Sequence, residues 1–297
     1  MKTLLFGQTG QIGWELARSL SLFGELVVLG RNDADFSDPP SLAGIIGRER
    51  PDVIVNAVAY TAVDKAESEP EQAMGINAEA PRVLAKAAAA HGALLVHYST
   101  DYVFNGRKPD AYREDDPTDP QSVYGRSKRA GEQAIVNSGA KHLILRTSWV
   151  HAPRGRNFVR TMLRLARERD RLSVVEDQFG APTGAELIAD VTALAIRARQ
   201  YGRMDDGIYH LTASGRTSWH AFARFILAEA IAAGVALKAR PDDVAPIPSG
   251  DYPAPAERPA NSTLDSSRLE GALGVTLPPW QHHARRTVRE LVENEQA

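Results

Sequence analysis

The stretch FGQTGQIG, residues 6–13, carries three glycines at intervals of three: Gly7, Gly10 and Gly13. It follows an apolar run at residues 2–6 and precedes a segment with the apolar spacing of a helix. A tight glycine turn at this position brings backbone N–H groups and the positive helix end toward a pyrophosphate. The pattern therefore favours a dinucleotide-binding turn over a purely structural one, with a spacing that differs from the more familiar GxGxxG.

Apolar runs of strand length alternate with helical patterns through the first half of the chain. The predicted strands lie at residues 2–6, 25–30, 52–59, 93–100 and 142–150. The helical patterns lie at residues 12–23, 41–50, 71–91 and 124–138. Strands that are apolar on both faces and joined by helices are typical of a parallel sheet. The predicted fold class is α/β, with a doubly wound, Rossmann-like parallel sheet.

The alternation loosens after residue 150. Helices are predicted at 157–170, 185–200, 218–234 and 280–295, with short strands at 172–177 and 207–212. Six prolines between residues 241 and 259 predict an extended segment, either a linker or a loop that lines a pocket. We expect a dinucleotide-binding domain at 1–150 and a smaller α/β domain, mainly substrate-binding, at 151–297. Part of 184–215 is expected to return to the first domain.

Composition narrows the classes of partner. Lys and Arg number 35 against 37 Asp and Glu, for a net charge of -2, and no long run has a single sign. This balance argues against nucleic acid as the main partner. The chain has no cysteine, which excludes thiol nucleophiles and cysteine-ligated metal sites. No signal peptide and no apolar run of about 18 residues is recognisable, so we predict a cytoplasmic protein without a membrane partner.

The end of the second predicted strand bears on the choice of nicotinamide cofactor. An acid there would hydrogen-bond a ribose 2′-hydroxyl, but this chain has Gly30 and Arg31. A guanidinium can bind a 2′-phosphate, so NADPH is favoured and NADH use is left open. The alternative is that Arg31 is a solvated surface charge. Asp35 and Phe36 are predicted to flank the adenine.

Tyr124 and Lys128 stand four positions apart on a predicted helix, so they share one face. Alone, they could be two surface side chains. Together with the glycine turn and Thr100 after the fourth strand, they resemble the extended short-chain dehydrogenase/reductase superfamily. Tyr124 would then protonate the oxygen of a carbonyl as hydride reaches its carbon, and the Lys128 ammonium would stabilise the phenolate. Thr100 would orient that oxygen, and the resemblance implies that Lys128 also binds the nicotinamide ribose.

Longer strings sharpen the resemblance. NAVAYTAVDKAE, HYSTDYVFNG, VYGRSKRAGE, DQFGAPTGAELIAD and ERPANSTLD are similar to the dTDP-4-dehydrorhamnose reductase family. This resemblance implies reduction of the 4-keto group of dTDP-4-dehydro-L-rhamnose by NADPH. The expected cofactor contacts are Gly7, Thr9, Gly10, Gln11, Ile12, Gly13, Arg31, Asp35, Phe36, Ala59, Tyr60, Thr61, Tyr124 and Lys128. The expected substrate contacts are Thr100, Asp101, Tyr124, Trp149 and Asn261.

Some of these assignments have alternatives. Trp149 would form an apolar wall against a 6-deoxy sugar, or it would be an ordinary core residue. His151 would tune the sugar pocket or be a loop histidine. Some members of the resembled family bind Mg²⁺ near a dimer contact, and the matching residues are Glu15, Glu186 and Glu290. Solvated glutamates on helices are the alternative, and a homodimer is predicted on the same basis.

Other functions of this fold are weighed against the reductase. Nucleotide-sugar 4,6-dehydratases carry an Asp-Glu pair where this chain has Asp101 and Tyr102, so elimination of water is disfavoured. A reductase of another dTDP-4-keto sugar stays an alternative. So does a non-catalytic, NADP-binding regulatory subunit of the methionine adenosyltransferase type. The intact set of Thr100, Tyr124 and Lys128 favours an enzyme.

Overall fold

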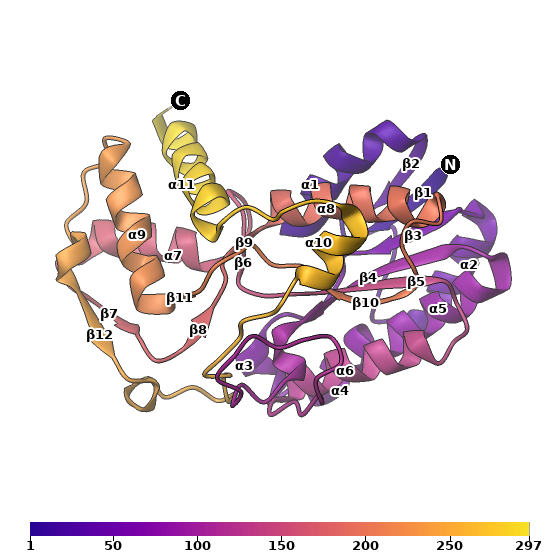
Figure 1. The fold of residues 1–297 in the computed structure, drawn as a ribbon, viewed down its shortest axis with the longest axis horizontal. Coiled ribbons are helices and arrows are strands. Elements are labelled where there is room, and N and C mark those ends of the chain that lie inside the picture. The colour runs from indigo at the N-terminus through magenta and orange to yellow at the C-terminus, as the bar shows by residue number, and fades with distance from the viewer. Residues whose placement is uncertain (297) are drawn as a thin grey trace.

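A six-stranded parallel sheet forms the centre of the computed structural model, which describes residues 1–296, with side chains to residue 293 (Figure 1). Its strand order is β10-β5-β4-β3-β1-β2, and every neighbouring pair is parallel. The strands are β1 (Lys2–Phe6), β2 (Glu25–Leu29), β3 (Val53–Asn56), β4 (Leu94–Thr100), β5 (His142–Thr147) and β10 (Gly207–His210). The predicted doubly wound parallel sheet is therefore confirmed.

Helices cover both faces of the sheet (Figure 1). One face carries α1 (Gln11–Ser19) and α8 (Ala185–Gln200), which pack against each other. The other carries α2 (Pro39–Glu49), α5 (Ala80–His91) and α6 (Val123–Val136). The strands alternate accordingly, since Leu5 packs in one buried cluster while Leu4 and Phe6 pack in the other. Apolar residues at both alternating positions are thus explained by burial on both sides.

The order of the strands creates a crevice at the carboxyl ends of the central strands. The chain passes from β1 outward to β2 and then returns to β3 on the opposite side of β1. Loops that leave the carboxyl ends of β1 and β3 therefore run in opposite directions and leave a gap between them. Ligands of open α/β sheets bind at such a switch point.

Most of the chain beyond residue 150 lies at one end of the sheet (Figure 1). Three helices gather there: α7 (Phe158–Glu168), α9 (Trp219–Ala232) and α11 (Trp280–Gln296). Two-stranded sheets join β6 (Val150–His151) with β9 (Thr183–Gly184), β7 (Leu172–Val175) with β12 (Val244–Ile247), and β8 (Phe179–Gly180) with β11 (Thr217–Ser218). The proline-rich stretch thus contributes a strand, β12, which is flanked by 3-10 turns at Pro241–Asp243 and Ser249–Asp251. By contrast, β10 is the edge strand of the central sheet and α8 covers one face of it, and α10 (Ser267–Leu273) contacts both.

Two predicted elements are interrupted. The helix expected at 71–91 consists of α4 (Pro70–Met74), a π-helical turn at Gly75–Glu79, and α5, after the short α3 (Val63–Ala66). The wide turn presents the Asn77 amide to Tyr60 N and O and to the Ser127 hydroxyl. The strand expected at 142–150 breaks between β5 and β6, where Trp149 has a φ of 49°. Further 3-10 turns lie at Leu20–Phe23 and Asp101–Val103.

None of the helices in the described part of the chain is both long and apolar enough to cross a membrane.

Candidate active site

The crevice beside β1 holds a cavity of about 510 Å³, lined by the loops after β1, β2 and β3. Its lining includes nine of the predicted cofactor residues: Gly7, Thr9, Gly10, Arg31, Asp35, Phe36, Ala59, Tyr60 and Thr61. Lys65 and Gln72 also line it, and sequence reasoning missed them. The glycine turn and the end of β2 therefore meet at one cavity, as a dinucleotide site requires.

The glycine turn leaves no room for side chains at two of its positions. Gly7 has a φ of 98°, which favours glycine. A Cβ on Gly13 would lie 2.0 Å from the Gly7 carbonyl oxygen, so α1 begins directly against the turn. Gln11 and Ile12 lie in the first turn of α1, and the Gln11 Oε1 accepts a hydrogen bond of 2.7 Å from Asn157 Nδ2. Because such a cradle brings backbone close to a ligand, the residues present fit a pyrophosphate.

The end of β2 is polar and exposed. Arg31 is exposed at the cavity, and its charge acts with two hydrogen bonds from Ser37 to hold the pKa of Asp35 below its usual value. The bonds from Ser37 are the larger cause. Phe36 is buried, with its ring edge-on to Phe6 at 5.5 Å between centroids. Phe36 thus belongs to the core as well as to the cavity wall.

Helix α6 places Tyr124 and Lys128 beside the carboxyl end of β4. The Ser122 hydroxyl, two residues before Tyr124, caps α6 by accepting a hydrogen bond from Gly125 N. A Cβ on Gly125 would lie 2.2 Å from the Tyr102 carbonyl oxygen, so glycine lets α6 approach the loop after β4. The Tyr102 and Tyr124 rings meet edge to face at 5.4 Å. The helix start and β4 therefore fix the phenol together.

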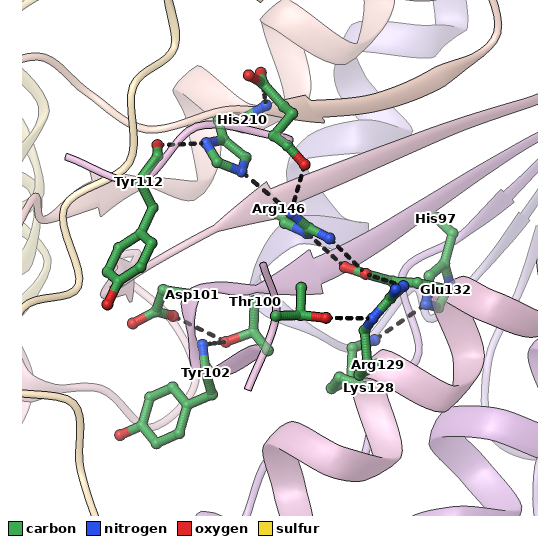
Figure 2. Close-up of polar contacts among 12 residues, drawn as sticks. His97, Thr100, Asp101, Tyr102, Tyr112, Lys128, Arg129, Glu132, Arg146 and His210 are labelled. Carbon is green, nitrogen blue, oxygen red and sulfur yellow. Dashed lines mark hydrogen bonds and ion pairs between the residues drawn. The ribbon is translucent and has the colours of Figure 1, made fainter. Parts of the chain in front are cut away.

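Lys128 is buried, with 2% of its surface exposed. Its Nζ donates a hydrogen bond of 2.6 Å to the Tyr98 carbonyl. The same Nζ lies 3.1 Å from His97 Nε2 (Figure 2). Burial lowers the pKa of Lys128 to about 8, while the charge of Glu132 one turn along α6 opposes this. Lys128 is thus an amine near its titration point at neutral to mildly alkaline pH.

Thr100, Asp101 and Tyr124 form the polar floor beside Lys128. Burial raises the pKa of Tyr124, and Asp101 adds to this while the Thr100 side chain opposes it, so the phenol is protonated at neutral pH. Thr100 Oγ1 donates to Asp101 Oδ1 over 2.8 Å (Figure 2). Burial also raises the pKa of Asp101 to about 6, while the Ser262 and Thr100 side chains oppose this. The buried Oδ2 has no hydrogen-bond partner within 3.5 Å at suitable angles. A buried, unpartnered carboxylate oxygen is the kind of group that a bound hydroxyl would satisfy.

Trp149 and Asn261 differ in their contacts: Trp149 stacks on another ring, whereas the Asn261 amide is fully hydrogen-bonded within the chain. Trp149 stacks on Trp219 at 3.4 Å between centroids and is half-buried; Gly180 has no Cβ to collide with its ring. Asn261 donates to the carbonyls of Lys108 and Asp110, and its Oδ1 accepts two bonds from Thr263. Asn261 therefore ties the 108–110 loop to the segment that follows the proline-rich stretch, and a substrate contact by it stays a prediction.

The three glutamates predicted for Mg²⁺ line one cavity of about 220 Å³ between α1, α8 and α11. Two of them are already paired with cations: Glu15 with Arg18 at 3.4 Å and Glu186 with Arg286 at 3.0 Å. Within residues 1–293, no group of three or more acidic or histidine side chains has an arrangement that could hold a metal ion. The three carboxylates thus line one cavity, but arginines already pair with two of them, and Mg²⁺ binding there stays a prediction.

His151 lines the same cavity as these glutamates. It is buried, with Nδ1 3.0 Å from the Thr287 hydroxyl, and burial lowers its pKa to about 3. His151 is thus a neutral residue packed against α11.

A buried ionic network behind Lys128 was missed. Arg146 on β5 donates two hydrogen bonds, of 2.7 and 2.8 Å, to Glu132 on α6 (Figure 2). Arg129 also contacts Glu132, and His210 lies 3.5 Å from Arg146. The signal for it was present, because an arginine and a histidine stand within runs that are otherwise apolar on both faces.

Comparison with known proteins agrees with this site. The family model described as RmlD substrate binding domain matches residues 1–293. A dTDP-4-dehydrorhamnose reductase of Burkholderia thailandensis is 50% identical, over 98% of this chain and 99% of the relative. The chain belongs to the dTDP-4-dehydrorhamnose reductase family.

Solved members of the dTDP-4-dehydrorhamnose reductase family superpose along the whole chain. The structure from Clostridium acetobutylicum has a TM-score of 0.89 at 33% identity and covers 100% of both chains. The Bacillus anthracis structure, a complex with NADP, has a TM-score of 0.87 at 33% identity and covers 98% of this chain and 100% of the other. The resemblance expected from the motifs is thus confirmed, because family membership extends across the sheet and the C-terminal helices alike.

Proposed function

We propose that this chain reduces the 4-keto group of dTDP-4-dehydro-L-rhamnose with NADPH and forms dTDP-L-rhamnose. The observation that carries the proposal is the placement of Thr100, Tyr124 and Lys128 at the carboxyl end of β4, the strand beside β3, whose loop lines the cavity of the glycine turn. Relatives that are about half identical over nearly the full chain are dTDP-4-dehydrorhamnose reductases, which supports the same substrate.

The residues around the crevice fit NADPH. The glycine turn accepts a pyrophosphate, and the Arg31 guanidinium at the cavity supports a 2′-phosphate on the ribose. When bound, NADPH supplies the hydride that adds to the carbonyl carbon. The Bacillus anthracis relative forms a complex with NADP, which supports this cofactor, and NADH stays a second candidate.

The side chains of the chain supply the proton and the orientation. Tyr124 transfers the phenol proton to the carbonyl oxygen as negative charge develops there, and general acid catalysis of this kind contributes about 10² to 10⁴ in rate. The Thr100 hydroxyl holds that oxygen in place. Asp101 accepts a hydrogen bond from a sugar hydroxyl on its unpartnered Oδ2, and Trp149 packs against the apolar edge of the 6-deoxy ring.

The division of labour along the chain is also a proposal. Residues 1–150 bind the dinucleotide, residues 151–297 mainly bind substrate, and part of 184–215 acts with the first group. The pairing of β10 with β5 in the central sheet and the packing of α8 against α1 support that return. We place the enzyme in the cytoplasm as a homodimer. Mg²⁺ at Glu15, Glu186 and Glu290 stays a prediction. Sedimentation with and without EDTA tests the homodimer and its dependence on a divalent cation.

Absorbance of NADPH tests the function directly. The signal should fall only when dTDP-4-dehydro-L-rhamnose is supplied, and the Tyr124→Phe variant should bind NADPH but lose at least about 100-fold in kcat. Tyr102→Phe is the matched control, because it removes the hydroxyl from the other ring of the same edge-to-face pair. Persistence of the absorbance with fresh substrate, or equal losses in the two variants, would reject the proposal.

A further inference from the structure

His97 on β4 bridges Asn56 on β3 and Lys128 on α6. The ring is buried, with 1% of its surface exposed. His97 Nδ1 lies 3.1 Å from Asn56 Nδ2, and its Nε2 lies 3.1 Å from Lys128 Nζ. Figure 2 shows the contact between His97 and Lys128. The reaction proposed above uses Lys128 but gives no role to the two residues behind it.

The backbone of the chain fixes the orientation of the Asn56 amide. Val58 N–H donates a hydrogen bond of 3.0 Å to Asn56 Oδ1. A backbone N–H is a donor only, so the amide oxygen must face Val58 and the NH₂ group must face His97. Turning the amide over would set two donors against each other.

This orientation selects one tautomer of His97. Asn56 Nδ2 can only donate, so His97 Nδ1 must accept. Burial, aided by the Lys128 charge, holds the pKa of His97 well below 6.5, so the ring is neutral and carries a single proton. That proton lies on Nε2 and points at Lys128 Nζ.

The His97 Nε2–H that points at Lys128 Nζ disfavours the ammonium form of Lys128 relative to the neutral amine. An ammonium has three donors and no lone pair, so it meets Nε2–H as donor against donor, whereas the neutral amine can accept from it. The Tyr98 carbonyl accepts from Nζ in either state. The other titratable or charged groups around Lys128 are Tyr124 and Glu132 on its own helix, Asp101 after β4, and Arg146 on β5, which Glu132 neutralises.

We propose that His97 is a positioning residue for the reduction, with its tautomer set by Asn56, and that it prepares Lys128 to release a proton. The proposal rests on the proposed function. After Tyr124 gives its proton to the carbonyl oxygen, one N–H bond of the Lys128 ammonium breaks and an O–H bond forms on the phenolate. A proton from solvent then restores the ammonium. A proton donor acts best with a pKa near the working pH, which an ordinary lysine lacks.

The tautomer can be read without any substrate. We would label the histidines of the full chain with ¹⁵N and record ring nitrogen–proton correlations, assigning His97 from His97→Gln or His97→Asn, either of which suffices. The expected spectrum has the proton on Nε2 and an acceptor at Nδ1. A proton on Nδ1, or a doubly protonated ring, overturns the proposal.

Asn56→Asp should reverse the tautomer of His97 with little change in side-chain shape. One carboxylate oxygen still accepts from Val58 N–H, but the other now accepts from His97 Nδ1–H, which leaves Nε2 as an acceptor for the ammonium. The Lys128 pKa should rise by about one pH unit, and the alkaline fall in kcat should move upward by the same amount. A fall that stays in place or moves to lower pH overturns the proposal.

Asn137→Asp at the exposed end of α6 is the matched control. It adds the same charge at the far end of the helix that carries Lys128, away from His97, so the pH profile should not move. An equal shift would mean that general charge, not the tautomer, controls Lys128. A wild-type chain that fails to reduce the dTDP sugar refutes the proposed function alone, because the ¹⁵N spectrum still reports the tautomer.

Discussion

Replacing Glu132 by glutamine should destabilise the protein strongly, because Arg146 would stay charged and buried without its partner. The two side chains are 0% and 2% exposed, and the carboxylate accepts two hydrogen bonds from the guanidinium. Removal of one partner from a buried pair costs about 3–5 kcal/mol, since the remaining charge has neither water nor a counter-ion. We therefore expect the free energy of unfolding to fall by that amount.

Urea unfolding followed by circular dichroism measures this cost. Glu79→Gln is the control, because Glu79 pairs with Arg82 where the side chains are 45% and 40% exposed, and its loss should be about 1 kcal/mol or less. The double change Glu132→Leu with Arg146→Met should recover much of the stability, because no charge is left buried. Equal destabilisation by Glu132→Gln and Glu79→Gln would refute the reasoning.

Four further changes test other parts of the site and of the fold. Arg31→Ala should raise the KM for NADPH about tenfold and leave that for NADH unchanged, because only NADPH carries the 2′-phosphate; steady-state kinetics with each cofactor decides this. Gly13→Ala places a Cβ 2.0 Å from the Gly7 oxygen and should lower stability by at least about 1 kcal/mol in thermal unfolding. Gly44→Ala, with open space around it, should instead stabilise α2 by about 0.5–1 kcal/mol. The pKa of Asp101 is about 6 in the folded chain against an ordinary 3.8, so protonation of Asp101 favours folding. Its contribution to the free energy of unfolding is complete below pH 3.8 and is lost as pH rises through 6. Asp101→Asn should therefore flatten the fall in stability between pH 4 and 6 by up to about 3 kcal/mol, which urea titrations at each pH would measure.

The sheet and the glycine turn were predictable because their causes are local. Runs such as residues 2–6 are apolar on both faces, and only a sheet covered by helices on both sides buries them. Gly7 and Gly13 predict a tight turn, because a side chain is strained at the backbone conformation of the first and collides with the turn at the second. Tyr124 and Lys128 share a helix, so their common face also follows from the sequence.

The partners of Lys128 were not predictable in the same way. His97, Glu132 and Arg146 come from β4, α6 and β5, and only the strand register brings them together. A charge within an apolar run signals that some partner exists, but not which one. The π-helical turn beside Asn77 is likewise fixed by contacts with Tyr60 and Ser127, which no periodicity in residues 71–91 reveals.

Helix α6 connects these groups along one face. Tyr124, Lys128 and Glu132 follow one another at intervals of four, so proton donor, amine and carboxylate stand in a row beside the sheet. At one end of the row, Tyr124 lies against Tyr102, just after β4. At the other end, Glu132 is neutralised by Arg146. Because Glu132 raises the pKa of Lys128 while burial lowers it, a change in the Arg146 pair must reach the amine as well as the fold. Stability and proton transfer therefore share one carboxylate, and Glu132→Gln should lower the alkaline limit of any activity that depends on the Lys128 ammonium.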